Sequence, residues 1–261
     1  MMINRILAEF LKIKRQPELR IVLSVFLLFI LFIFFQKGMN RQSGFYSPEL
    51  LNAQYLSSFN LLLICLVGFI PVVVIGSFIS GIEYKNNTNV FTITSTGRIY
   101  SVLVKIITLI FTILLLVLSM VLLGIIESLL IIPKKNIYIE WSILIPQLLT
   151  TFLDLLGSAF LGFLCTVLTK KIYGGIIFAV ILPLIIERIS FYVPYFQYFT
   201  FDYYSLSLVN VSFKNLSKDP QIQLAVLDQF PFGVSLIVCL LIVISIMLIQ
   251  MMIVMKREFR A

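Results

Sequence analysis

The stretch SVLVKIITLIFTILLLVLSMVLLGIIESLLII, residues 101–132, decides the fold class of this chain. Lys105 and Glu127 are its charged residues. About 20 apolar residues are enough for a helix to cross the hydrocarbon of a bilayer, where the backbone has to satisfy its own hydrogen bonds. The stretch therefore predicts a membrane-spanning helix.

Similar apolar runs recur along the chain. Of its 261 residues, 60% are hydrophobic and the mean hydropathy is +1.07, whereas a soluble domain is about 45 to 50% apolar. We expect an all-α polytopic membrane protein that forms one transmembrane domain over residues 1–261. Its six predicted transmembrane helices lie near 19–36, 55–82, 101–132, 143–169, 172–198 and 233–255.

The basic residues indicate an orientation in the membrane. The net charge is +8 and the pI is near 9.4, but Lys and Arg are dispersed between the apolar runs, so membrane lipid is expected as a partner and nucleic acid is not. With the N-terminus inside, 13 of the 20 basic residues fall in inner segments. Because cytoplasmic loops carry an excess of Lys and Arg, both termini are predicted to be cytoplasmic.

The N-terminal segment 1–17 is predicted to be an interfacial helix. Its apolar residues recur at helical spacing on one face and its charged residues surround the other, a pattern typical of helices that lie along a membrane surface. Pro17 should then break or bend the helix before the first span.

The fifth run is interrupted by Pro183, which is followed by Glu187 and Arg188. Residues 172–186 are too few for a full crossing. We expect a broken fifth helix that continues as an outer re-entrant element, within an extracellular region at 187–232. Residues 201–232 are expected to form an external loop, and tyrosines such as Tyr195 should lie in the outer headgroup belt.

Asp154 lies in the middle of the fourth run, where a charged carboxylate costs about 2.5 to 3.5 kcal/mol. Small and polar residues at spacings of three and four place it on one stripe of the helix. This stripe predicts either a helix-packing seam, in which Asp154 makes an interhelical hydrogen bond, or a role in contacting substrate. Its polar members are Gln147, Thr150, Thr151, Asp154 and Ser158.

Several classes of chemistry are absent from the sequence. There is no histidine, and neither GxxxxGK[ST] nor GxGxxG occurs, so the chain lacks the common motifs for binding ATP or a dinucleotide. Cys65, Cys165 and Cys239 are isolated in apolar runs. We expect no enzyme activity, no metal and no cofactor bound by this chain.

The connection between the second and third runs, residues 83–100, is polar. It begins with Glu83, Thr88 follows five positions later, and Arg98 and Lys105 stand seven positions apart. This pattern resembles permeases of type-2 ABC exporters, which place Glu, Thr, Arg and Lys at these positions around the second and third helices. The layout of six spans and an N-terminal interfacial helix is also similar. Residues 89–95 depart from the family, since they replace an expected Leu-rich stretch.

The resemblance implies that this connection forms a cytoplasmic coupling helix that docks on an ABC ATPase, with ATP and Mg on that partner. It implies two ATPase copies and a second permease subunit, as a homodimer or a heterodimer. Glu83 would pair with Arg98 or with a basic residue of the N-terminal helix. The implied coupling residues are Glu83, Tyr84, Lys85, Asn86, Asn87, Thr88 and Arg98.

In such a permease the stripe around Asp154 would line the dimer seam or the substrate pathway, and Glu187, Arg188 and Tyr195 would belong to an outer gate. Permeases of this size resemble those that export antimicrobial or amphipathic peptides, including immunity systems, from the bacterial cell. The alternative is a secondary transporter coupled to protons or ions through Asp154 or Glu127. Such transporters normally show two related halves, and no internal repeat is found.

Overall fold

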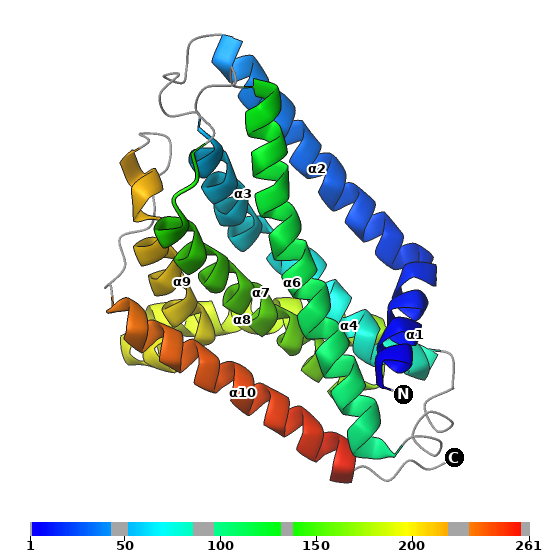
Figure 1. Cartoon of the computed structure of the whole chain (residues 1–261). Helices are drawn as coiled ribbons and strands as arrows, with labels where there is room; N and C mark the ends of the chain where they lie inside the picture. Colours follow the sequence, from blue (N-terminus) through cyan, green and yellow to red (C-terminus); the bar gives the residue numbers. More distant parts are fainter. Residues whose placement is uncertain (1, 43–51, 86–96, 132–137, 219–229, 257–261) are drawn as a thin grey trace.

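The computed structural model describes residues 2–42, 52–85, 97–131, 138–218 and 230–256 (Figure 1). All regular elements in these ranges are helical, which confirms the predicted all-α class. The helices are α1 (Met2–Arg15), α2 (Pro17–Gln42), α3 (Ala53–Val67), α4 (Phe69–Lys85), α6 (Arg98–Ile131), α7 (Trp141–Thr169), α8 (Ile172–Tyr192), η1 (Pro194–Phe199), α9 (Phe201–Ser212), η2 (Lys214–Lys218) and α10 (Phe232–Lys256).

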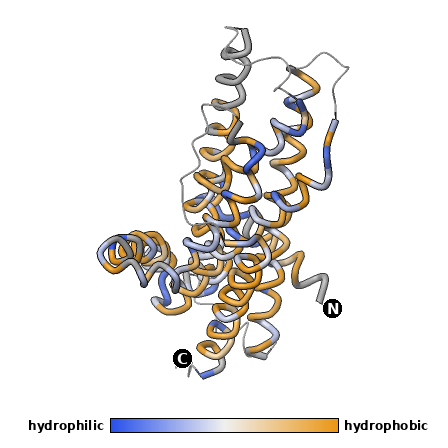
Figure 2. The backbone as a smooth tube through the Cα atoms, turned by 90° about the vertical axis from the view of Figure 1, so that its left-hand side faces the viewer, coloured by the Kyte–Doolittle hydropathy of each residue, from blue (hydrophilic) through white to orange (hydrophobic). Residues whose placement is uncertain are grey.

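Several of these helices are suited to a membrane. Ile99–Leu130 of α6, Trp141–Thr169 of α7 and Phe232–Val254 of α10 are each long and apolar enough to cross a bilayer. Hydrophobic residues predominate along the helices (Figure 2). The bent pair α3 and α4 makes a fourth candidate. Several membrane-spanning helices are thus supported, and the full set of six stays a prediction.

The second predicted span, 55–82, is not one straight helix. α3 and α4 meet at Gly68 with a bend of 66°. Pro71 explains the position of the bend, since proline has no N–H for the carbonyl of Val67 and its ring clashes with that carbonyl. The backbone N–H of Gly68 instead bonds to Ile64 O at 2.7 Å and closes α3.

The region after Pro183 also differs from expectation. α8 continues through Pro183 to Tyr192, so the break in the helix lies at Val193. The expected external loop at 201–232 begins instead with α9 and η2, and α9 buries residues such as Tyr203 and Leu208. The polar residues of α9 contact other helices, which explains why a polar stretch is folded. Residues 219–229 lie outside the described ranges.

The two N-terminal helices are separated where the sequence predicted. Gln16 is the non-helical residue between them, and Pro17 is the first residue of α2, a position at which its missing N–H costs little. On α1, Leu7 and Leu11 are more than half exposed, whereas Glu9 is buried. Glu9 therefore faces the protein, whereas Leu7 and Leu11 are left open.

The centre of the fold is the contact between α4 and α7, where glycines let the backbones approach. A Cβ atom on Gly76 would lie 2.0 Å from the carbonyl oxygen of Ala159, and one on Gly162 would lie 2.3 Å from that of Val73. The hydroxyl of Ser77 donates to Gly162 O at 3.1 Å. Small residues at a helix interface give the close packing typical of membrane bundles.

Candidate functional site

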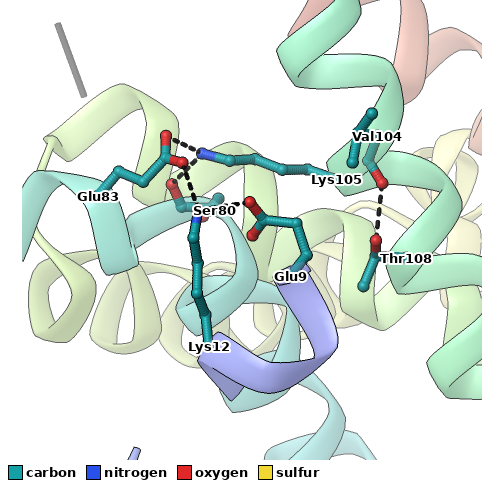
Figure 3. A network of polar contacts seen from close by, with 7 residues as sticks. All are labelled: Glu9, Lys12, Ser80, Glu83, Val104, Lys105 and Thr108. Atoms are coloured by element: carbon teal, nitrogen blue, oxygen red, sulfur yellow. Dashed lines mark hydrogen bonds and ion pairs between the residues drawn. The ribbon is translucent and has the colours of Figure 1, made fainter. Parts of the chain in front are cut away.

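A cluster of charged side chains joins α1, α4 and α6 (Figure 3). Glu83, near the end of α4, accepts hydrogen bonds from the ammonium of Lys105 of α6 at 2.9 Å and from that of Lys12 of α1 at 3.0 Å. Lys12 also pairs with Glu9 at 2.6 Å. Two carboxylates and two ammonium groups therefore balance one another. The pairing that the resemblance implied between Glu83 and a basic residue of the N-terminal helix is present.

The cluster is most strongly buried at its centre. The side chains of Glu83 and Lys105 are 1% and 8% exposed, and that of Lys12 is 39% exposed. Lys105 also lies 3.5 Å from Ser80 O. A buried charge that loses its partner is costly, because desolvation is no longer offset. Glu83 and Lys105 therefore depend on each other, and Lys12 is the more dispensable member.

The charge on Lys12 is stabilised by its neighbours. Partial burial lowers the pKa of Lys12, but the hydrogen bond and charge of Glu9, followed by those of Glu83, raise this pKa above its ordinary value overall. Lys12 is therefore an ammonium at neutral pH. It holds α1 against the end of α4 through a charge-assisted contact, the stronger kind of hydrogen bond.

The cluster joins the two helices that border the predicted coupling connection, α4 before it and α6 after it. Glu83 and Tyr84 belong to the last turn of α4, which ends at Lys85, and Arg98 begins α6. Asn86, Asn87 and Thr88 lie outside the described residues, as do the side chains of Lys85 and Arg98.

A second polar group is formed by the stripe on α7. Gln147 is fully buried, and its carbonyl oxygen accepts from Ser58 of α3 at 2.6 Å. Its amide donates to Asn215 Oδ1 at 2.9 Å and to Ser212 O at 3.1 Å. Gln147 thereby connects α7 to α3 on one side and to the end of α9 and η2 on the other.

The neighbouring stripe residues make the same kind of contact. Thr150 shares a hydrogen bond of 2.7 Å with Ser212, and the thiol of Cys65 donates to Thr151 Oγ1 at 3.4 Å. One turn further along α7, Asp154 accepts from Ser205 of α9. The interhelical bond of Asp154 that the seam interpretation required is therefore present.

Ser158 marks the point where the seam meets open space. Its hydroxyl donates to Asp154 O at 3.1 Å. Ser158 and the adjacent Gly157 line a cavity of about 150 Å³ between α7, α8 and α9. Ser158 therefore lines this cavity, whereas Gln147, Thr150 and Thr151 are inside the helix packing.

The predicted outer gate is not joined to the stripe by any described contact. Arg188 near the end of α8 is exposed, and Tyr195 of η1 is 79% exposed. The side chain of Glu187 lies outside the described residues. Any gating role of Glu187, Arg188 and Tyr195 therefore stays a prediction.

Glu127, the other carboxylate considered for ion coupling, is engaged elsewhere. Asn60 of α3 donates to Glu127 Oε2 at 3.1 Å, and each residue is 4% exposed. Nearby, a Cβ on Gly124 would lie 2.6 Å from Ser57 Cα. Glu127 therefore belongs to the close contact of α3 with α6.

The sequence indicated the central residues of the two polar groups, such as Glu83 and Gln147, but not most of the residues that pair with them. Glu9, Ser205, Ser212 and Asn215 were not selected as site residues. The spacing of Glu9 and Lys12 on one helix was an available signal, whereas Ser205 and Ser212 lay in a stretch taken for a loop. Within the ranges that the structure describes, no group of three or more His, Cys, Asp or Glu could hold a metal ion.

No family model, curated protein or solved structure matches this chain. Function is therefore inferred from the residues and contacts above.

Proposed function

We propose that this chain is the transmembrane permease subunit of an ATP-driven ABC exporter in a bacterial cell membrane. Both termini lie in the cytoplasm, and the cargo is an amphipathic or antimicrobial peptide. The complex contains two copies of a cytoplasmic ABC ATPase and a second permease subunit, identical to this chain or different from it.

The observation that carries the proposal is the buried pairing of Glu83 with Lys105 and Lys12. These contacts tie α1, α4 and α6 together at the two ends of the connection 86–96. Because a buried ion pair has a fixed geometry, a push on this connection moves the three helices as one unit. The connection is therefore suited to receive motion from a docked protein.

The energy source has to be another chain. No phosphate-binding loop occurs in the sequence, so ATP and Mg are held by the partner ATPase, and this subunit performs no covalent chemistry. Glu83, Tyr84, Lys85, Asn86, Asn87, Thr88 and Arg98 are assigned to coupling. Glu187, Arg188 and Tyr195 are assigned to the outer gate.

Asp154 supports a second candidate function, a secondary transporter coupled to protons or ions. Asp154 belongs to α7, which is long and apolar enough to span a membrane, and its carboxylate accepts a hydrogen bond from Ser205. Carboxylates at such depth often mark ion pathways. The ABC exporter is favoured, because the charge cluster borders the polar connection that the resemblance assigns to ATPase docking.

The proposal is tested by purifying the chain gently from its native membrane and identifying the accompanying proteins by mass spectrometry. We expect a soluble ABC ATPase. A variant with residues 86–96 shortened should insert in the membrane and lose this ATPase. A variant shortened within 219–229, in the expected extracellular region, is the control and should retain it. If the wild-type chain never brings down an ATPase, the proposal is wrong.

A further inference from the structure

The turn between α7 and α8 consists of two lysines. α7 ends at Thr169 and α8 begins at Ile172, so Lys170 and Lys171 form the whole connection. Both side chains are exposed, and neither is paired with a carboxylate within the part of the chain that the structure describes. Two positive charges are therefore presented together at the end of α7.

Lys170 stands at a backbone position that favours glycine. Its φ is 57°, in the left-handed region, and it is the one non-glycine residue with a positive φ among the described residues. Helices commonly end with glycine in this conformation, because a Cβ atom is unfavourable there. The turn itself therefore gives no reason for a lysine, and glycine in its place would remove the charge while suiting the backbone.

Exposed apolar side chains lie close to the lysines on both helices. Leu168, two residues before Lys170, is 51% exposed, and Tyr173, two residues after Lys171, is 59% exposed. α7 is long and apolar enough to cross a bilayer, and the turn directly follows its last residue. The turn is thus expected where the hydrocarbon meets the lipid headgroups, a depth that suits exposed tyrosine and lysine side chains.

The elements packed at the turn do not supply a carboxylate to the lysines. The first turn of α8 contains no acidic residue. α4 approaches the turn closely, since a Cβ on Gly81 would lie 2.5 Å from Ile172 Cγ1. Two residues further along α4, the carboxylate of Glu83 is already paired with Lys105 and Lys12. An anion that balances the two lysines would therefore come from outside the chain.

We propose that Lys170 and Lys171 bind the phosphate headgroup of an anionic phospholipid, in the leaflet where α7 ends. The phosphate pairs with the two ammonium groups, and the acyl chains lie along exposed apolar side chains such as Leu168. Basic groups beside transmembrane helices recognise anionic headgroups in this way. An acidic surface of a soluble protein is a poorer fit, because Leu168 and Tyr173 are exposed beside the lysines. The proposal requires that α7 spans a bilayer and does not rest on the exporter assignment.

The test places a fluorescent reporter beside the lysines. The full chain carries Trp141→Phe, which removes its one tryptophan, and Tyr173→Trp as the reporter, and is reconstituted in phosphatidylcholine bilayers. Part of the lipid is then replaced by phosphatidylglycerol or phosphatidylcholine with dibrominated acyl chains, which quench tryptophan on contact. The ratio of the two quenching constants gives the local preference for the anionic lipid. Each lysine should contribute about fivefold, so we expect a preference of roughly 20- to 30-fold.

Variants of this reporter chain separate the charge from the fold. Lys171→Gln and Lys170→Gly should each lower the preference about fivefold, whereas Lys171→Arg should retain it. Because glycine suits the left-handed backbone, a loss in Lys170→Gly is due to the charge and not to a damaged turn. Lys256→Gln removes an exposed lysine at the end of α10 and should leave the preference unchanged. Equal quenching of all variants by brominated phosphatidylcholine would show that they are inserted alike.

Equal quenching of the unsubstituted reporter chain by the two lipids would overturn the proposal. Full preference in the double variant Lys170→Gly with Lys171→Gln would do the same, and if this variant also lost the co-purified ATPase, the lysines would contact that protein instead. If inorganic phosphate at constant ionic strength abolished the preference, the site would bind a free anion and the lipid assignment would be wrong. Because the bilayers contain no ATPase, none of these lipid measurements bears on the exporter assignment.

Discussion

Glu83 and Lys105 form an ion pair of 2.9 Å between the last turn of α4 and α6, and both side chains are almost completely buried. Burying such a pair costs desolvation energy, so the pair is weak evidence for stability by itself. Removing one partner is nevertheless strongly destabilising. It fixes the end of α4 against α6 on either side of the connection 86–96. Lys12 extends this fixed unit to α1.

Glu83→Gln should destabilise the protein by about 3 to 5 kcal/mol, because it leaves the ammonium of Lys105 buried and unpaired. Unfolding in mixed SDS and detergent micelles measures this free energy. Glu140→Gln, at an exposed carboxylate that accepts a hydrogen bond from nearby Ser142, is the control and should change it by less than about 0.5 kcal/mol. Equal effects of the two substitutions would contradict the importance of the cluster.

Lys12→Gln should have a smaller effect on global stability, about 1 kcal/mol or less, because Lys12 is partly exposed and its pairs are screened. Its local effect should be larger, since Lys12 joins α1 to Glu83. Hydrogen exchange of the α1 amides should accelerate while exchange in α7 stays unchanged. Unaltered protection of α1 would show that other contacts hold this helix.

Gly76→Ala should destabilise the fold by about 1 to 3 kcal/mol through overpacking, because its new Cβ would lie 2.0 Å from the carbonyl oxygen of Ala159. Gly174→Ala in α8 is the matched control, since its nearest contacts would be at 3.6 Å. It should be neutral or stabilising by up to about 1 kcal/mol through helix propensity. The same unfolding measurement compares the two. A tolerated Gly76→Ala would mean that α4 and α7 are further apart than described.

Gln147→Leu should cost about 1 to 3 kcal/mol, because Ser58 and Asn215 lose a buried hydrogen-bonding partner. Ser245→Ala removes an exposed hydroxyl that bonds within its own helix to Leu241 O, and it should have almost no effect. If Gln147→Leu also left the free energy of unfolding unchanged, the seam between α3, α7 and η2 would not stabilise the chain.

Long apolar runs made the helices easy to predict. The expected spans 101–132, 143–169 and 233–255 correspond closely to α6, α7 and α10, because a continuous apolar run leaves few other structures in lipid. The bend at Gly68 was harder to anticipate. Pro71 was present as a local signal, but the hydropathy of 55–82 is continuous across it.

The contacts of polar residues could not be predicted in the same way. The composition of Ser205, Ser207 and Asn210 is typical of an exposed segment, yet all three are buried in α9. Whether a polar side chain is buried depends on a partner from a distant part of the sequence, such as Asp154 for Ser205. The stripe on α7 was therefore recognisable, whereas the helices that cover it were not.

The central claim is that motion enters through the connection after α4 and is driven by a separate ATPase. It is tested most directly with vesicles that contain this chain alone or together with its co-purified ATPase complex, by following transport of a fluorescent cationic amphipathic peptide. The account predicts uphill transport only with the ATPase and Mg-ATP, insensitive to a proton ionophore. Uphill transport by the chain alone in a proton gradient, abolished by Asp154→Asn, would contradict it.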